Sequence, residues 1–460
     1  MAWREATEPV RMQRVALVAP ADSLRDMLVR VADAGKVELD HLSPGVGPAP
    51  AAAAPGGGGA RMLSATAPDL EELRRQGRAD LLAGETELES YAADAASRGD
   101  VRALLAWMPA AALPELADRL AEVGAGVVPL ETPRGLDPPT LLVSGSRVRQ
   151  SFSQLVSTYG TVPYADVDPS MLAGAAYVLM FGMMFGDAGH GTLLVVAGLL
   201  LRTGYPRRFA RFRGIWPFVV GAGLTAICFG LLYGEFFGPT GVVPVLWVAP
   251  LEAPVTLLAA ALGVGAVLLA TAQVLGTVNR WREGGWPLAL SSPSGVAGGA
   301  LLGGLGLVVL GADADVAWLV TAGALVMAGG VALAFVGFLA TSGGGTAGVM
   351  QASVEVFDAV MRVGLNLLSF ARLAAFGLTH AAIGALVWDG TTGLWSSGGL
   401  LAVAAVLVFV IGNAVAFGLE ALVAGVQALR LEYYELFSRV FSNEGRPFHP
   451  WHVPVEGRQT

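Results

Sequence analysis

The chain has 460 residues, of which 54% are hydrophobic and only 14% are charged, and its mean hydropathy is +0.59. This composition is typical of a polytopic membrane protein with a modest soluble part. The net charge of −8 leaves no basic face to neutralise phosphates, which argues against nucleic-acid binding, and the single cysteine, Cys228, excludes an intramolecular disulfide framework.

Residues 1–160 predict a compact cytosolic α/β domain. Residues 12–42 alternate two short apolar runs with an amphipathic helical pattern, and residues 101–130 repeat the order strand, helix, strand. Between them, residues 43–60 are rich in Pro, Ala and Gly and indicate a flexible linker, whereas the charged stretch 68–97 favours solvated helix. Because the first twenty residues lack an apolar core of signal-peptide length, we expect the amino terminus to stay in the cytosol.

Residues 161–445 predict a mainly α-helical transmembrane domain, followed by a cytosolic tail at 446–460. Most of its apolar stretches approach the roughly 20 residues that a spanning helix needs, and the first two are short enough for a tight hairpin. About eight stretches occur: 171–186, 189–202, 215–236, 254–279, 294–311, 316–340 and the two long, tilted ones at 347–388 and 399–440. Basic residues in the loops after the second and fourth stretches and in the tail place both chain ends in the cytosol.

The last two stretches carry ionisable or polar side chains at depths where a lipid-facing helix would not tolerate a charge. They are Asp358, Arg372 and His380 in the first stretch and Glu420, Gln427 and Arg430 in the second. On one continuous helix, Asp358 and Arg372 would lie about 21 Å apart on the same face. Two arginines at similar depth would form a fixed positive barrier between two offset wet half-paths, because a guanidinium keeps its charge. Alternatively, the arginines could snorkel near helix ends and the histidine could only bond a neighbouring helix.

Three further acidic residues lie near the ends of apolar stretches: Glu235 at the end of 215–236, and Glu432 and Glu435 at the end of 399–440. Glu235 could line the outer half-path or only anchor a loop, and the loop interpretation is slightly favoured. Glu432 and Glu435 flank two tyrosines, and we expect them at the cytosolic surface. The sequence contains no phosphate-binding loop, so any ATP chemistry would belong to partner subunits.

Several stretches carry recognisable motifs. The segment 181–191 reads FGMMFGDAGHG and contains Phe185, Gly186, Asp187, Gly189, His190 and Gly191. It resembles the signature of the membrane subunit of rotary V-type and A-type ATPases, called subunit a or subunit I. The segments 159–169 and 369–380 resemble the same family, and Glu420 and Arg430 keep the ten-residue spacing of its functional pair.

This resemblance implies roles for single residues. Arg372 and Arg430 would face the proteolipid rotor ring and force each rotor carboxylate to release its proton, because a nearby guanidinium favours the ionised form. Asp358 would serve the cytosolic half-channel. Glu420, helped by His380, would serve the outer one, with Glu235 and Gln427 as further candidates along the proton path. Asp187 and His190 are interpreted as shaping the hairpin rather than carrying protons.

The same resemblance implies a non-enzymatic stator subunit without cofactor or bound metal in the cell membrane. Its partners would be the rotor ring, peripheral-stalk and central-stalk subunits and membrane lipid. The short amino-terminal domain departs from the family pattern, which usually has a long helical hairpin there that leads to the stalk-binding ends. A secondary transporter, which would be expected to have repeated halves, and a non-transporting assembly subunit, which would be expected to lack the paired arginines, stay open as alternatives.

Overall fold

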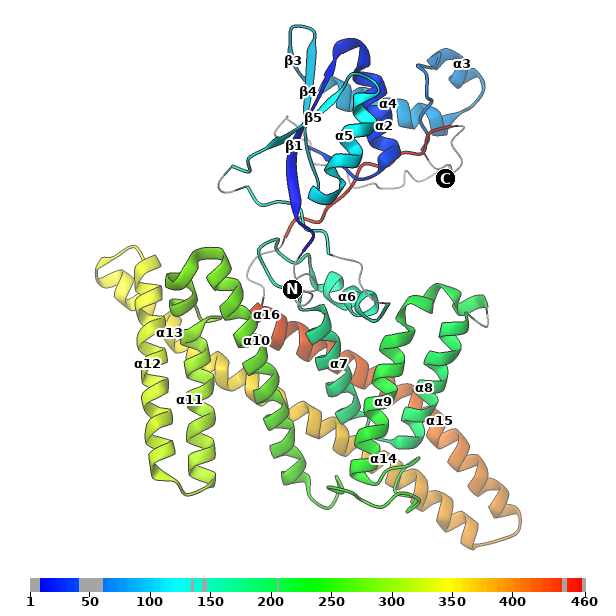
Figure 1. Cartoon of the computed structure of the whole chain (residues 1–460). Coiled ribbons are helices and arrows are strands. Elements are labelled where there is room, and N and C mark those ends of the chain that lie inside the picture. Colours follow the sequence, from blue (N-terminus) through cyan, green and yellow to red (C-terminus); the bar gives the residue numbers. More distant parts are fainter. Residues whose placement is uncertain are drawn as a thin grey trace. The chain divides into compact units, whose positions relative to one another are not determined.

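The computed structural model describes residues 9–40, 61–133, 136–142, 147–204, 207–440 and 445–456 (Figure 1). The predicted linker 43–60 lies outside the described residues. The chain forms two compact units, one built from residues 9–142 with 445–456 and the other from residues 147–440. Each unit is described separately below.

The first unit is an antiparallel sheet with helices packed against it. Its strands are β1 (Met12–Pro20), β2 (Glu38–Leu39), β3 (Ala96–Arg98), β4 (Val101–Pro109) and β5 (Gly126–Leu130), in the order β2-β4-β1-β5 with β3 on β4. In the central pair, Val15 lies opposite Ala106 and Leu17 opposite Leu104, and all four side chains are buried. The alternation along β1 places every second side chain in the core, as the period of a strand requires.

Helices of the first unit cover this core. They are α2 (Leu24–Ala34), α3 (Leu70–Arg75), α4 (Ala79–Ala93) and α5 (Leu113–Ala121). α2 buries Met27, Leu28 and Val31 on one face, which is the pattern of an amphipathic helix. The solvated stretch predicted at 68–97 is helical in α3 and α4 but ends in strand β3. This unit confirms the small α/β domain that the sequence predicts.

The carboxyl-terminal segment belongs to the core of the first unit. Trp451, Val453 and Val455 are buried among the side chains of the sheet unit. The Trp451 amide donates to the Val37 carbonyl at 2.7 Å, and the Leu63 amide donates to the Pro454 carbonyl at 2.8 Å. The sequence analysis treats residues 446–460 only as a tail, whereas residues 445–456 help to build the domain.

The second unit contains eight apolar helical segments. By length and composition, six spans in the described chain could cross a membrane: 212–233, 254–291, 296–313, 317–341, 345–396 and 400–440; α7 and α8 are shorter. Its helices are α6 (Arg147–Tyr159), α7 (Ser170–Met184), α8 (Ala188–Thr203), α9 (Trp216–Tyr233), α10 (Pro254–Ser291), α11 (Val296–Asp313), α12 (Ala317–Thr341), α13 (Gly345–Ser369), α14 (Ala371–Ser396), α15 (Leu400–Leu431) and α16 (Ser438–Val440). A polytopic, mainly helical fold is therefore confirmed.

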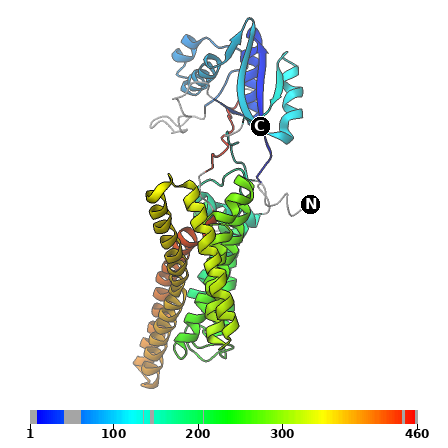
Figure 2. The same ribbon diagram turned by 90° about the vertical axis from the view of Figure 1, so that its left-hand side faces the viewer.

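The long helices α13, α14 and α15 are inclined to the upright helices of the same unit (Figures 1 and 2). Asp358 and Arg372 lie in one helical span, 345–396, which is interrupted at Phe370. Phe370 separates α13 from α14 and is completely buried against Gly265 of α10. Burying this aromatic ring at the junction fixes the start of α14, where Arg372 is the second residue.

The loop before α7 packs onto the last turns of α10. The Asn279 side chain accepts from the Val167 amide at 3.1 Å and donates to the Val440 carbonyl at 3.2 Å. Arg149 and Asp168 form a buried ion pair at 2.6 Å. Burial, with the nearby Glu283 carboxylate, raises the pKa of the fully buried Asp166 to about 7. Asp166 therefore titrates close to neutral pH.

Truncating the carboxyl-terminal anchor should loosen the whole first unit. Trp451→Ala removes a buried indole and should destabilise this unit by about 3–5 kcal/mol. Hydrogen exchange of the full chain should then be faster across β1, α2 and β2. His449→Ala, at an exposed neighbouring side chain, is the control and should change exchange little. Unchanged protection in Trp451→Ala would show that the segment is not part of the core.

Replacing Asp166 should change how stability depends on pH. Its pKa is about 7 in the fold and about 3.9 in an unfolded chain. The folded form therefore holds the proton more tightly, and this contribution to stability is lost as pH rises from about 4 to about 7. The Asp166→Asn variant cannot ionise at this position, so its free energy of unfolding, relative to the wild type, should be higher at pH 8 than at pH 4 by on the order of 2–4 kcal/mol. Thermal unfolding in detergent at the two pH values measures this difference. An equal difference at both pH values would contradict the prediction.

Candidate functional site

Asp187 fixes the short connection between α7 and α8. It is the amino-terminal cap of α8, and its Oδ1 accepts from the His190 amide at 2.8 Å. Its Oδ2 accepts from the Gly238 amide at 2.9 Å, in the loop that follows α9. The side chain is fully buried, so it satisfies two buried backbone amides and joins two loops. The predicted role in shaping the hairpin agrees with these contacts.

The signature glycines allow the connection to pack closely. A Cβ atom on Gly186 would lie 2.5 Å from the Tyr233 ring, and one on Gly189 would lie 2.5 Å from the Phe237 ring. On Gly191 a Cβ atom would meet the Ile227 amide nitrogen of α9 at 2.7 Å. Such distances exclude any larger residue without movement of the backbone. The glycines therefore set the spacing between α8 and α9 and hold His190 in place.

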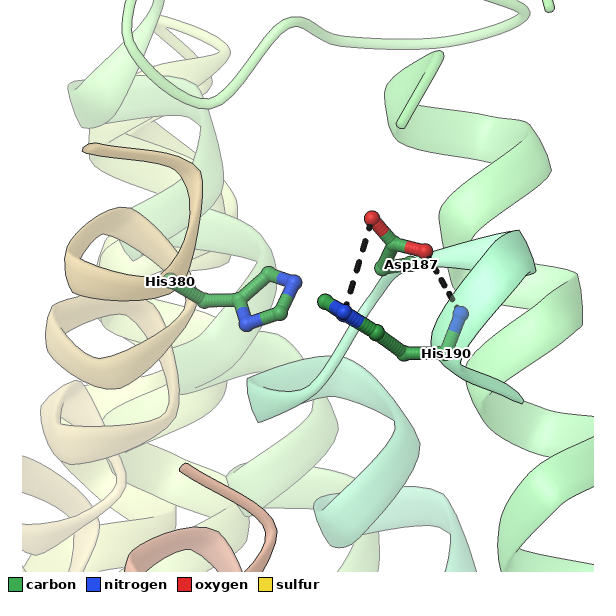
Figure 3. A group of neighbouring side chains, drawn as sticks. All are labelled: Asp187, His190 and His380. Carbon is green, nitrogen blue, oxygen red and sulfur yellow. Dashed lines mark hydrogen bonds and ion pairs between the residues drawn. The ribbon is translucent and has the colours of Figure 1, made fainter. Parts of the chain in front are cut away.

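His190 and His380 face one another across the unit. Figure 3 shows His190, on α8, and His380, on α14, pointing toward the same space beside Asp187. Their ring centroids lie 5.7 Å apart, and Nδ1 of His190 lies 3.8 Å from Oδ2 of Asp187. The Phe185 ring packs against both imidazoles and is completely buried. Residues far apart in the sequence thus form one buried polar group surrounded by aromatic rings.

Glu420 of α15 extends this group. Its Oε2 contacts Nδ1 of His380 in a close ion pair between the α14 and α15 helices. Glu235 is only 4% exposed, and its Oε2 would lie 3.6 Å from a Cβ atom placed on Gly384, one turn after His380. Glu235 therefore lies against α14 and not at a loop surface. Asp187, His190, Glu235, His380 and Glu420 form what we call the outer group.

The predicted arginines lie further along the same two helices. Arg372 is partly buried, and the charges of Arg430 and Glu435 act on it. Its Nη1 has no hydrogen-bond partner among the residues that the structure describes. Arg430 is exposed, and the buried Oε1 of Gln427 on the same helix also lacks a partner. The structure thus brings the two arginines near each other, with Gln427 between them and the outer group along α15.

A third polar group lies beyond the arginines. With its amide oriented to satisfy its neighbours, Asn366 donates to Oε2 of Glu435 at 3.0 Å and accepts from Nη2 of Arg439 at 3.2 Å. Arg439 also donates to Gln273 of α10 at 2.9 Å. We call Asn366, Glu435, Arg439 and Gln273 the inner group.

A cavity of about 570 Å³ opens beside this inner group. Its lining includes Glu355, Arg362, Asn366, Ser438 and Arg439. Asp358 does not line it: this side chain is half exposed and pairs with Arg362 one turn along α13. Of the two acidic side chains on this part of α13, Glu355 is the one that reaches the cavity.

The expectation that Glu432 and Glu435 lie at the surface is wrong. Glu432 is completely buried at the start of a π-helix (Glu432–Phe437), and Glu435 is 9% exposed. Neither carboxylate oxygen of Glu432 has a hydrogen-bond partner within the described part of the chain, and its surroundings include Leu172, Ala176 and Leu268. The irregular helix turns these side chains inward, which a regular 3.6-residue period does not predict.

The sequence reasoning noted Glu355 and Asn366 among the polar residues of the last two stretches without giving them a role, and it missed Gln273 and Arg439 as members of the inner site. The i,i+4 spacing of Glu435 and Arg439 could have pointed to a pair on one helix face. Gln273 and Asn366 lie on other helices and carry no local signal. Only the packing of α10, α13 and α16 brings them together.

Comparison with known proteins supports one family. Residues 94–243 match the V-type ATPase 116kDa subunit family, and this range includes the FGMMFGDAGHG segment. The A-type ATP synthase subunit I of Pyrococcus horikoshii is 26% identical over 411 residues, which cover 83% of this chain and 60% of that protein. The corresponding subunit of Aeropyrum pernix is 28% identical over 353 residues, covering 66% of this chain and 50% of that protein.

A third relative has a higher sequence identity over a shorter segment. The V-type ATP synthase subunit I 2 of Treponema pallidum is 37% identical over 141 residues, or 28% of this chain and 31% of that protein. The chain spans about half the length of the curated relatives it matches. The matches to A-type and V-type subunits agree with the motifs and with the apolar helices described above. These matches support the family of the membrane subunit of V-type and A-type rotary ATPases, subunit a or I, for this chain.

Proposed function

We propose that this chain is the stator membrane subunit of a rotary ATPase, in which it forms two offset half-channels against a proteolipid rotor ring. Proton movement through them would couple to rotation. The observation that carries the proposal is the order of three polar groups along the helices α13 to α15. The outer group contains His380 and Glu420, the arginines follow, and the inner group with its cavity comes last.

The arginines between the groups supply the barrier. An ion that enters by one group cannot pass directly to the other, because Arg372 and Arg430 keep a fixed positive charge between them. A rotor carboxylate that reaches this position would be favoured in its ionised form and would release its proton. The unpaired Nη1 of Arg372 is available for such a partner.

Exposed apolar surfaces on α13 and α15 supply the contact for the ring. On α13 they recur three or four residues apart, at Met350, Val354, Phe357, Met361, Leu365 and Leu368. On α15 a similar series runs through Val403, Leu407, Ile411, Val415, Leu422 and Val426. Such stripes fit lipid or other apolar helices. Arg430 is exposed on α15, which carries the second stripe, so ring and barrier would meet there.

The half-channels would use the residues of the two groups. The outer one would run through Glu235, His380 and Glu420 toward Gln427. The inner one would enter the cavity beside α13, where Glu355 and Asp358 are the acidic candidates. ATP chemistry would take place on partner subunits, and peripheral-stalk and central-stalk subunits would complete the complex.

The proposal includes a membrane topology with both ends of the helical region on the cytosolic side. It is supported by the first unit, in which residues that precede and follow the helical region pack in one core. Eight apolar segments in the described chain fit this topology if each crosses once. The arginines that follow α8, among them Arg208 and Arg213, favour the cytosol for that side by the positive-inside rule.

Removing the barrier should abolish coupling. Arg372→Ala should lower ATP-driven acidification of vesicles containing the assembled complex by at least about tenfold, equivalent to about 1.4 kcal/mol. Assembly, measured by co-purification of the other subunits, should be unchanged. Arg208→Ala, at an exposed side chain after α8, is the matched control and should pump normally. Normal pumping by Arg372→Ala would favour a non-transporting assembly subunit.

The two acidic residues of α13 can be separated by paired variants. Because Glu355 lines the cavity and Asp358 is exposed beside Arg362, Glu355→Gln should slow proton pumping by about threefold or more, equivalent to about 0.7 kcal/mol. Asp358→Asn should slow it less. Initial acidification rates at matched complex content provide the measurement. A larger loss in Asp358→Asn would assign the inner half-channel to Asp358 instead.

A further inference from the structure

Three side chains of the outer group have the composition of a metal site. Asp187, His190 and His380 each offer one ligand atom, and these atoms lie within 4.8 Å of one another (Figure 3). All three residues are buried. Neither ring nitrogen of His190, which is 2% exposed, makes a close hydrogen bond to the described residues. Asp187 and Asn413 act on this ring, with Oδ2 of Asp187 at 3.8 Å from Nδ1. A buried imidazole usually has a close partner, which a bound ligand would supply here.

The surroundings already orient the other two ligands. Nδ1 of His380 is occupied by Glu420, which leaves Nε2 as the nitrogen that can bind a metal. A carboxylate behind a histidine is the usual support for a metal-binding imidazole, because it fixes the tautomer and increases its basicity. Oδ2 of Asp187 is held by the Gly238 amide. Two of the three ligands therefore have positions set by neighbouring residues.

The spacing fits a small divalent ion after modest side-chain rotation. Metal–ligand bonds of about 2.0–2.2 Å in a tetrahedral site separate neighbouring ligand atoms by roughly 3.3 Å. Oδ2 of Asp187 and Nδ1 of His190 already lie 3.8 Å apart. Two imidazoles with one carboxylate suit zinc and similar transition metals, whereas calcium and magnesium prefer oxygen ligands alone.

We propose that Asp187, His190 and His380 form a binding site for a divalent transition-metal cation of the zinc class, with water as a fourth ligand. The bound cation would join the start of α8 to α14. It would also occupy the imidazole that contacts Glu420, so that the cation would inhibit proton exchange through the outer half-channel. This inhibition rests on the proposed function, whereas metal binding itself does not.

Cobalt provides a direct probe, because tetrahedral Co²⁺ with nitrogen and oxygen ligands absorbs visible light. The purified full chain in detergent should bind Co²⁺ with a visible band that one equivalent of Zn²⁺ removes. His190→Gln and Asp187→Asn should each weaken binding by about tenfold or more, and His190→Cys, which keeps a metal ligand, should restore it. The double variant His449→Gln/His452→Gln, at exposed histidines outside the site, should bind like the wild type.

Two results would overturn the site: no saturable Co²⁺ or Zn²⁺ binding by the wild type, or equal binding by His190→Gln. A second measurement tests inhibition. Zn²⁺ should slow ATP-driven acidification in vesicles of the assembled complex, and His190→Gln, compared with its own rate without metal, should need about tenfold more Zn²⁺ for half-inhibition. Intact binding without inhibition would keep the metal site and contradict the proposed role of His380 and Glu420.

Discussion

The helical unit depends on the condition that a polar group inside a membrane must find its partner within the protein. The contact between His380 and Glu420 meets this condition for two ionisable side chains at once and joins α14 to α15. The inner group meets it through Asn366, Glu435 and Arg439. Among the described residues the condition is not met everywhere: one nitrogen of Arg372, both ring nitrogens of His190 and both carboxylate oxygens of Glu432 are buried without a close hydrogen-bond partner. At these positions a ligand or a partner subunit would supply the missing contact.

The close packing of α7, α8 and α9 supplies the rigid side of the site. Phe185, Asp187 and His190 come from one short connection, and glycines bring it against α9 at distances that no side chain would allow. The hydroxyl of Tyr177 on α7 also donates to the Gly425 carbonyl of α15 at 3.1 Å. The signature segment and α7 thus pack against α14 and α15, with Phe185 in contact with His380 and Phe417. The main effect of this packing is to fix the positions of side chains on α14 and α15.

Local patterns were sufficient to predict most elements but not the buried polar network. The strands and helices of the first unit and the apolar helices of the second follow from periodicity and hydropathy, whereas the link between His380 and Glu420 was expected only from the family resemblance. The break between α13 and α14 did not follow from the sequence, because apolar residues continue across Phe370, whose ring packs against Gly265. The burial of Glu432 and Glu435 depends on a π-helix, and the place of Trp451 depends on contacts more than 400 residues away in sequence, with Val37 among them.

The position of Trp451 also orders events during biosynthesis. The core of the sheet unit includes Val15 and Leu17 from its beginning and Val453 and Val455 from residues made after the last membrane helix. α15 must therefore be synthesised before this core can be completed, and until then the sheet unit lacks the buried side chains of its carboxyl-terminal segment. Completion of the soluble core thus comes after synthesis of the whole helical unit.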